Sequence, residues 1–248
     1  MSRSFTYTAL VLRVKPSGES NREAWFLTAE EGILRATVFG GPKSRLRAHI
    51  APFHQGVLWI YHDPVRDSRK VSDFDVRLWR PGIRERYERA MAAGAVVETV
   101  LSSHGGGGVW ARALELTGGA LDALEEADEK TCGRILIHFL WNWADVLGVR
   151  PGLTVCTSCG HSAGPGEALW FSPAEGTFLC PACSAAARGG NVFAIGPGAR
   201  RWLLAVQDLD ASLLSRLTLD EASRTQAKAL ATAILSEALG KRLSTWDE

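Results

Sequence analysis

The chain has 248 residues, of which 46% are hydrophobic and 22% are charged, and its formal net charge at pH 7 is +1. This composition is typical of a globular protein with a sizeable core, and it excludes collagenous and intrinsically disordered chains. The first apolar run stops at Arg13, which makes it too short to span a bilayer, and no small-residue cleavage site follows it. We therefore expect a cytoplasmic protein without a membrane partner.

The charge is distributed unevenly along the chain. Residues 1–89 carry 16 Lys and Arg against 10 Asp and Glu, a balance of +6, whereas residues 90–248 carry 12 against 17, a balance of −5. A basic part on a nearly neutral whole favours contact with a polyanion such as nucleic acid. Chance unevenness of solvated surface charge is the alternative that composition leaves open.

The first 80 residues contain five short segments rich in β-branched and aromatic residues, with turn signals such as Asp63-Pro64 between them. These segments predict strands at 5–14, 24–28, 33–40, 56–62 and 71–78. Because most of them have no helix-length pattern between them, they predict a small antiparallel barrel. A five-stranded, partly open barrel is the OB-fold, a frequent host for oligonucleotides.

Pro81-Gly82 marks a change from strand to helix periodicity. Apolar residues then recur at helical spacing and predict helices at 83–97, 114–124, 135–147, from 197 through 203, and from 220 to about 243. The four consecutive glycines at 105–108 are expected to interrupt the helical pattern as a linker. Asp220 is the expected N-cap of the last helix.

Four of the five cysteines form two C-x₂-C pairs, Cys156 with Cys159 and Cys180 with Cys183, and 20 residues lie between the pairs. Two such turns facing each other offer four thiolates, the ligand set of a tetrahedral zinc site. Since the protein fills every coordination position, we expect one structural Zn²⁺ rather than a catalytic one. Disulfides, a redox-active C-x₂-C pair and an iron–sulfur cluster are the alternatives, and a reducing cytoplasm disfavours the disulfides.

Other potential metal ligands are predicted to have structural roles. Cys132 and His138 lie in apolar helical patterns and are expected in the core. Gly160 follows the first cysteine pair, where a turn of this kind often needs a positive φ. His161 is a competing ligand in principle, but the four thiolates already complete the site.

Residues 40–47 (Gly-Gly-Pro-Lys-Ser-Arg-Leu-Arg) place three cations within five positions after a predicted strand. An exposed, positive loop of this kind suits contacts to phosphates without sequence preference, and cations on neighbouring strands or turns extend the patch. The predicted DNA-binding residues are Arg13, Lys15, Arg35, Lys43, Arg45 and Arg47. An ordinary solvated loop is the alternative.

The sequence contains no convincing set of residues for covalent catalysis. Its six histidines form no H-E-x-x-H pattern, and there is no G-x-x-x-x-G-K-[ST] loop. A zinc deaminase needs an open metal position and a nearby Glu in an H-x-E or C-x-E setting, which does not precede Cys180. We therefore expect a protein that is not an enzyme, with a zinc-dependent nucleic-acid enzyme as the rival interpretation.

Several short segments carry a family resemblance through their order and spacing. They are 9–13 (Ala-Leu-Val-Leu-Arg), 18–20 (Gly-Glu-Ser), 28–32 (Thr-Ala-Glu-Glu-Gly), 40–46, 147–151 (Leu-Gly-Val-Arg-Pro) leading to Cys156, and 239–245 (Leu-Gly-Lys-Arg-Leu-Ser-Thr). Together they resemble the RecO family of bacterial recombination mediators over almost the whole chain. The sequence departs from the family pattern in its four glycines and in the tryptophan-rich segment 139–143.

The expected fold class is α+β. An N-terminal five-stranded OB-fold barrel (1–80) precedes an all-α C-terminal domain in two parts (81–151 and 191–248), which a four-cysteine zinc module (152–190) interrupts.

The resemblance implies a nucleoid-associated mediator that binds single- and double-stranded DNA and anneals complementary strands. It also implies loading of recombinase onto strands coated by single-strand binding protein. The implied partners are RecR and the acidic, hydrophobic tail of that coating protein. Such a tail needs an apolar pocket rimmed by cations, for which Arg134, Arg200 and Arg201 are candidates. An adaptor that binds only protein is the alternative.

Overall fold

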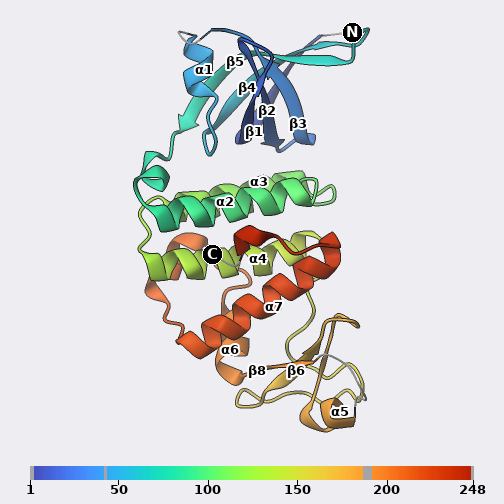
Figure 1. Ribbon diagram of the computed structural model, residues 1–248. Helices are drawn as coiled ribbons and strands as arrows, with labels where there is room; N and C mark the ends of the chain where they lie inside the picture. Colours follow the sequence, from blue (N-terminus) through green and yellow to red (C-terminus); the bar gives the residue numbers. More distant parts are fainter. Residues whose placement is uncertain (1–2, 42–43, 187–191, 247–248) are drawn as a thin grey trace. The chain divides into compact units, whose positions relative to one another are not determined.

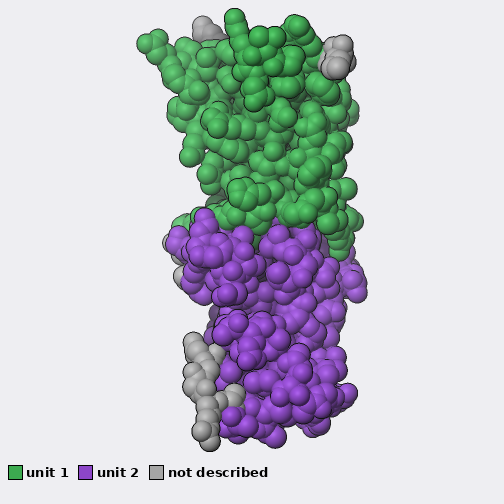
Figure 2. Space-filling view, turned by 90° about the vertical axis from the view of Figure 1, so that its right-hand side faces the viewer, with its two compact units in different colours: residues 1–126 green, residues 127–248 purple. Residues whose placement is uncertain are grey.

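The computed structural model describes residues 3–41, 44–186 and 192–246. The chain forms two compact units, residues 1–126 and residues 127–248 (Figure 2). Within the described ranges, no helix combines the length and the apolar character that crossing a bilayer requires.

Five strands of the first unit close into a barrel with the order β1-β2-β3-β5-β4 (Figure 1). They are β1 (Ser4–Ser17), β2 (Asn21–Thr28), β3 (Gly32–Val38), β4 (Gln55–Asp63) and β5 (Ser68–Leu78). Neighbouring strands are antiparallel except β3 and β5, whose parallel pairing at Thr37 and Lys70 completes the closure together with the β1–β4 pair. This is the OB-fold that the sequence predicts.

Strand β1 pairs with two neighbouring strands because it bends. Its register with β2 shifts between Val11 and Arg13, and such a bulge kinks a strand and re-aims its side chains. The first half of β1 pairs with β4 and the second half with β2. Alternate residues of the strands fill the barrel, where Phe26 and Phe74 meet edge to face with ring centroids 6.1 Å apart. The residues between them face outward.

A short helix, α1 (Arg45–His49), lies between β3 and β4, where the sequence predicts an irregular basic loop. The prediction of a loop is wrong for this part of the segment. Five residues are too few for a periodic apolar pattern to show, and α1 has no fully buried residue. The helix gives Arg45 and Arg47 fixed positions beside the barrel.

The first unit also contains the 3₁₀ turn η1 (Pro81–Glu85) and two packed helices, α2 (Tyr87–Ser102) and α3 (Trp110–Leu124), which contact the barrel strands. Arg80 holds α3 to the barrel. Its buried guanidinium donates to Asp122 Oδ1 (2.6 Å), to the Phe53 carbonyl (2.7 Å) and to Gln55 Oε1 (2.8 Å). These contacts group residues 81–126 with the barrel, and the boundary expected at residue 80 stays a prediction.

The four glycines at 105–108 end α2, as predicted. All four have positive φ, from 68° to 109°, a conformation that other residues rarely adopt. The run is more than a linker, because a Cβ on Gly105 would lie 3.0 Å from Ile33 Cγ1. The turn therefore packs closely against the hairpin of β2 and β3.

The second unit is built on α4 (Glu129–Val146), which packs against α7 (Glu221–Leu239), while α6 (Pro197–Ala205) contacts α7 as well. The remaining elements are η2 (Ala211–Arg216), η3 (Ser244–Trp246), β6 (Leu169–Ser172), β7 (Thr177–Leu179), α5 (Pro181–Ala186) and β8 (Phe193–Ile195), with the strand order β7-β6-β8.

Trp141 and Trp143 are fully buried in α4, so the tryptophan-rich segment is core. His138, whose Nε2 lies 2.9 Å from the Leu209 carbonyl oxygen, and Cys132 are buried as well, which confirms their predicted roles. Asp220 caps α7 as predicted, and its carboxylate accepts a hydrogen bond from Ser223 N (2.9 Å). The helix ends at Leu239, four residues before the expected end, because Gly240 takes the left-handed conformation.

Candidate metal centre and nucleic-acid interface

The first cysteine pair lies on a tight turn. A bridge between Val155 and Ser162 closes this turn, and Cys156 N donates to the His161 carbonyl (2.8 Å). Gly160 N donates back to the Cys156 carbonyl (2.9 Å), and Gly160 has the positive φ of 74° that the sequence predicts for this position. The backbone therefore turns both thiols to the same side.

The second pair lies where β7 meets α5. Cys180 directly follows the strand and Cys183 is in the first turn of the helix, where Ser184 N donates to the Cys180 carbonyl (2.9 Å). Thr157 N and Thr157 Oγ1 both donate to the Phe178 carbonyl, which binds the first turn to β7. The two turns thus face each other across a small core that contains Leu179 and Trp170.

The four Sγ atoms of Cys156, Cys159, Cys180 and Cys183 all lie within 4.8 Å of one another, and those of Cys159 and Cys180 are 3.8 Å apart. Four sulfurs at about 2.3 Å from one ion in a tetrahedron lie about 3.8 Å apart. A disulfide needs about 2.05 Å, and all the cysteines are free thiols. The structure therefore brings the four cysteines together in a cluster that fits a single metal ion.

Two thiols of the cluster have pKa values shifted in opposite directions. The hydroxyl of Ser158 lowers the pKa of Cys183, but hydrogen bonds with Cys159 and Cys180 together with burial raise it to about 12. Burial of Cys156 raises the pKa of its thiol, but hydrogen bonds from the backbone N–H groups of Cys180, Cys159 and Ser158 outweigh burial and bring the pKa to about 6. His161 is not part of the cluster, because its Nε2 pairs with Glu167 Oε2 at 2.9 Å. The prediction that the thiolates exclude it from the ligand set is consistent with this contact.

Arg200 of α6 holds the cysteine region in place. Its guanidinium donates to the carbonyl oxygens of Leu153 (2.9 Å), Gly164 (3.0 Å), Ala163 (3.3 Å) and Glu167. The side chain is buried, with 3% relative exposure for the residue. The prediction that Arg200 is available to rim a peptide pocket is therefore wrong, because all its donors point into its own unit.

The outer face of the barrel carries an aromatic residue between cations. Trp25 on β2 is half-buried, with Lys15 Nζ 5.7 Å and Arg35 Cζ 5.5 Å from its ring centroid. The two cations come from β1 and β3, the strands on either side. Arg13 is the Cα partner of Trp25 across the β1–β2 pair, which places a third predicted DNA-binding residue on the adjacent strand. Glu23 pairs with Arg35 at 2.5 Å and offsets part of the charge.

A cavity of about 340 Å³ adjoins this face at the β1–β2 turn. Three cations, Lys15, Arg22 and Arg47, and one carboxylate, Glu19, line it together with other residues of the β1–β2 turn. Burial lowers the pKa of Arg22, and the nearby Arg47 lowers it further, because two cations share a restricted space. Like charges held this close favour an anion between them.

Arg45, another predicted DNA-binding residue, does not line this cavity. Arg45 is exposed on α1, where its Nε lies 3.5 Å from His49 Nε2, and Lys43 falls outside the described residues. Trp25 and Arg22 are not among the residues predicted from the sequence, and neither is Lys70, which lies over the exposed ring of Phe39 at 5.3 Å. Strand alternation was the available signal, since it directs Trp25 outward beside Arg13 and Arg35.

Comparison with known proteins places the chain in a family. The family model described as Recombination protein O N terminal matches residues 1–76, and that of Recombination protein O C terminal matches residues 84–247. The chain belongs to the RecO family. This membership makes it part of a family of DNA repair and recombination proteins, as the sequence resemblance implies.

Curated relatives agree with this assignment. The "DNA repair protein RecO" of Rubrobacter xylanophilus is 34% identical over 191 residues, which cover 76% of this chain and 75% of the relative. The protein of the same name from Desulfitobacterium hafniense is 28% identical over 248 residues, covering 96% of this chain and 86% of the relative. That from Anaeromyxobacter is 30% identical over 192 residues, covering 77% and 74%.

Proposed function

We propose that the protein is a recombination mediator that binds single- and double-stranded DNA through its barrel and anneals complementary strands. The observation that carries this proposal is the grouping of Trp25, Lys15 and Arg35 beside a cavity lined by Arg22 and Arg47. Cations along a groove follow the phosphates, and an aromatic ring between them stacks on bases. RecO family membership supports the same conclusion.

The mechanism we infer is charge neutralisation without covalent chemistry. Two complementary strands repel each other, and a basic surface that binds both reduces this repulsion and raises their local concentration. The four-cysteine site leaves no position for a substrate when it holds one tetrahedral ion, so its proposed Zn²⁺ supports the fold. The protein is accordingly proposed not to be an enzyme.

We further propose that the protein helps to load recombinase onto strands coated by single-strand binding protein, with RecR and the acidic tail of that protein as partners. The family resemblance supports these partners. In the second unit, Arg201 is exposed and Arg134 is partly exposed, so they remain candidate cations for the tail, whereas the buried Arg200 does not. Action on DNA places the protein at the nucleoid.

Replacement of Trp25 by Ala tests the DNA site. We expect single-stranded DNA to bind about tenfold more weakly, because base stacking on an aromatic side chain contributes about 1–3 kcal/mol. Binding to duplex DNA should change little, since its bases are already stacked on one another. Fluorescence anisotropy with labelled single and double strands measures both affinities in the full-length protein.

Trp79 provides the matched control. It is also on the first unit and 45% exposed, but its ring packs against His49 and His54 instead of cations. Trp79→Ala should leave single-strand affinity close to that of the unchanged protein. Equal losses in both variants, or no loss in Trp25→Ala, would place the stacking site elsewhere. Absence of any salt-dependent DNA binding would favour the adaptor that binds only protein.

A further inference from the structure

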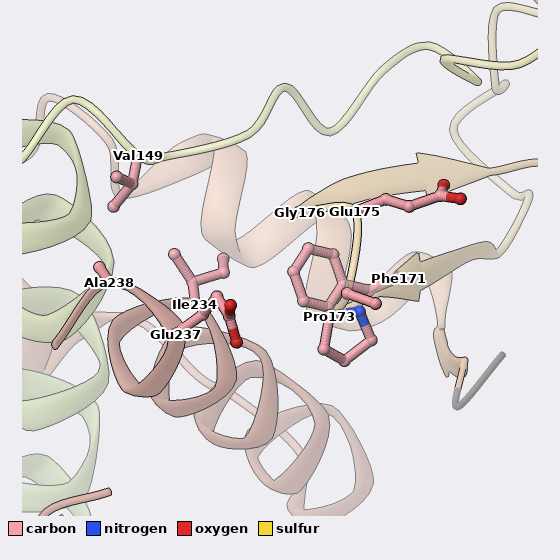
Figure 3. A pocket seen from close by; sticks show the side chains of 9 residues that line it. Val149, Phe171, Pro173, Glu175, Gly176, Ile234, Glu237 and Ala238 are labelled. Carbon is pink, nitrogen blue, oxygen red and sulfur yellow. The ribbon is translucent and has the colours of Figure 1, made fainter. Parts of the chain in front are cut away.

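A second cavity, of about 270 Å³, lies within the second unit (Figure 3). It is open to solvent and is bordered by α7, by the turn between β6 and β7, and by the segment that follows α4. Its apolar lining comes from Val149, Phe171, Pro173, Ile234 and Ala238. The cavity contains none of the four cysteines and none of the residues proposed to contact DNA.

The charged groups of this cavity are both carboxylates. Ile234, Glu237 and Ala238 occupy one face of α7, as residues three and four positions apart do. Figure 3 shows the Glu237 carboxylate turned from α7 toward Phe171 and Pro173, whereas the Glu175 carboxylate points away from Glu237 and accepts a hydrogen bond from Thr177 Oγ1 (3.4 Å). Within the described part of the chain, Glu237 makes no ion pair.

The position of Glu237 strengthens its negative potential. It lies in the last turn of α7, where free carbonyl groups already make the helix end negative. The cations that follow in sequence do not line the cavity. Arg242 donates to Thr232 Oγ1 (3.4 Å), five positions before Glu237 and about 140° around the helix from it. Lys241 is exposed beyond Gly240.

We propose that this cavity binds a segment of a partner protein that places a lysine or arginine side chain beside an apolar one. The alkyl stem and the apolar neighbour pack against Val149, Pro173 and Ala238, while the cationic head pairs with Glu237. The cavity has room for one or two side chains, below the size of a drug pocket, which is about 300–1,000 Å³. An acidic tail is repelled here, so this surface takes a different partner.

The test is a titration of the full-length, ¹⁵N-labelled protein with three short peptides, acetyl-Leu-Arg-Leu-amide and its Gln and Glu counterparts. We expect the Arg peptide to shift the amide signals of Val149, Gly176 and Ala238, and the Glu peptide to leave them in place. Glu237→Gln, which keeps the side-chain shape, should weaken binding of the Arg peptide about tenfold. Asp208→Asn removes an equal charge from an exposed site outside the cavity and should change nothing.

A second variant distinguishes binding of the peptide inside the cavity from a general attraction to the negative charge of Glu237. Ala238 is exposed on the same face of α7, and Ala238→Arg should occupy the cavity and abolish binding of the peptide. Equal binding of the Arg and Glu peptides, full affinity in Glu237→Gln, or no shifts at millimolar peptide would overturn the proposal. DNA affinity of both variants should remain that of the unchanged protein, so a failure here does not reflect on the proposed function.

Discussion

At the scale of single residues, Arg200 shows how a buried charged side chain can stabilise the fold. Its guanidinium is buried, and its donors reach four carbonyl oxygens of the cysteine region. Burial lowers its pKa, and the charge of Glu167 acts in the opposite direction. A buried cation is costly unless its donors are satisfied, and here the carbonyl groups satisfy them. The position of the loop from Leu153 to Glu167 therefore depends on this one side chain.

Replacing Arg200 by Gln should lower the free energy of unfolding by about 3 kcal/mol, because several buried carbonyl groups lose their donors. Urea denaturation followed by circular dichroism measures the change. Arg201 is the neighbouring residue, but it is exposed, so Arg201→Gln should cost less than about 0.5 kcal/mol. Similar stability of the two variants would contradict the assigned role of Arg200.

The clustering of the four cysteines could be predicted from sequence because each pair lies within one short turn, and spacing alone brings its thiols together. Arg200 could not be placed, since its partners lie 33 or more positions earlier in the chain. Trp25 and Arg22 are not among the predicted residues for a related reason. The cavity near them forms only when the β1–β2 turn meets α1 and Pro52.

At the scale of elements, the alternation of apolar and polar residues was sufficient to find all five barrel strands. Their ends were less certain, and β1 extends to Ser4 and Ser17 because a bulge lets it bend between two partners. The parallel pairing of β3 with β5 closes the barrel, but no local sequence pattern predicts this pairing. The long helices could be predicted because their apolar residues recur at helical spacing. Helix α1 is too short to contain such a repeat.

The four-cysteine cluster joins elements that are too small to be stable alone. The strands β7 and β8 have three residues each and α5 has six, so the proposed metal ion would supply much of their stability. We expect one Zn²⁺ per chain in freshly purified, reduced protein and loss of that ion in Cys159→Ser, with unfolding of the module. Inductively coupled plasma mass spectrometry measures the zinc content.

Cys132 gives the matched control for this experiment. It is buried in α4 and is not one of the clustered thiols, so Cys132→Ala should retain one Zn²⁺. If the unchanged protein contains no zinc, or contains iron instead, the proposed ion is wrong. If Cys159→Ser retains a full equivalent, the tetrahedral four-thiolate arrangement is wrong.

At the scale of the whole molecule, the two ends of the sequence differ in charge. The balance is +6 over residues 1–89 and −5 over residues 90–248, and the cations that share a cavity all belong to the first group. A net charge near zero overall limits nonspecific attraction, while a local surplus still attracts phosphates. The proposed annealing activity should therefore depend on a few positions of the barrel and not on total charge.

Simultaneous replacement of Lys15, Arg22 and Arg47 by Ala tests this dependence. Each lost phosphate contact should reduce the slope of log affinity against log salt by about 0.7 for single strands, so we expect the slope to fall by about 2. Annealing of complementary oligonucleotides should slow in parallel, because the same contacts offset the repulsion between strands. Anisotropy over a range of salt concentrations and a fluorescence-quenching annealing assay measure the two effects.

The control removes the same charge from elsewhere on the surface. Arg66, Arg112 and Arg216 are exposed and do not line the cavity, so their replacement by Ala should leave the salt slope and the annealing rate nearly unchanged. If both triple variants lose the same amount, attraction arises from total charge and the cavity is not a phosphate site. If only the Lys15, Arg22 and Arg47 variant loses slope but still anneals at the full rate, phosphate binding and annealing use different surfaces. Parallel loss of both, confined to that variant, is the outcome that charge neutralisation at the barrel requires.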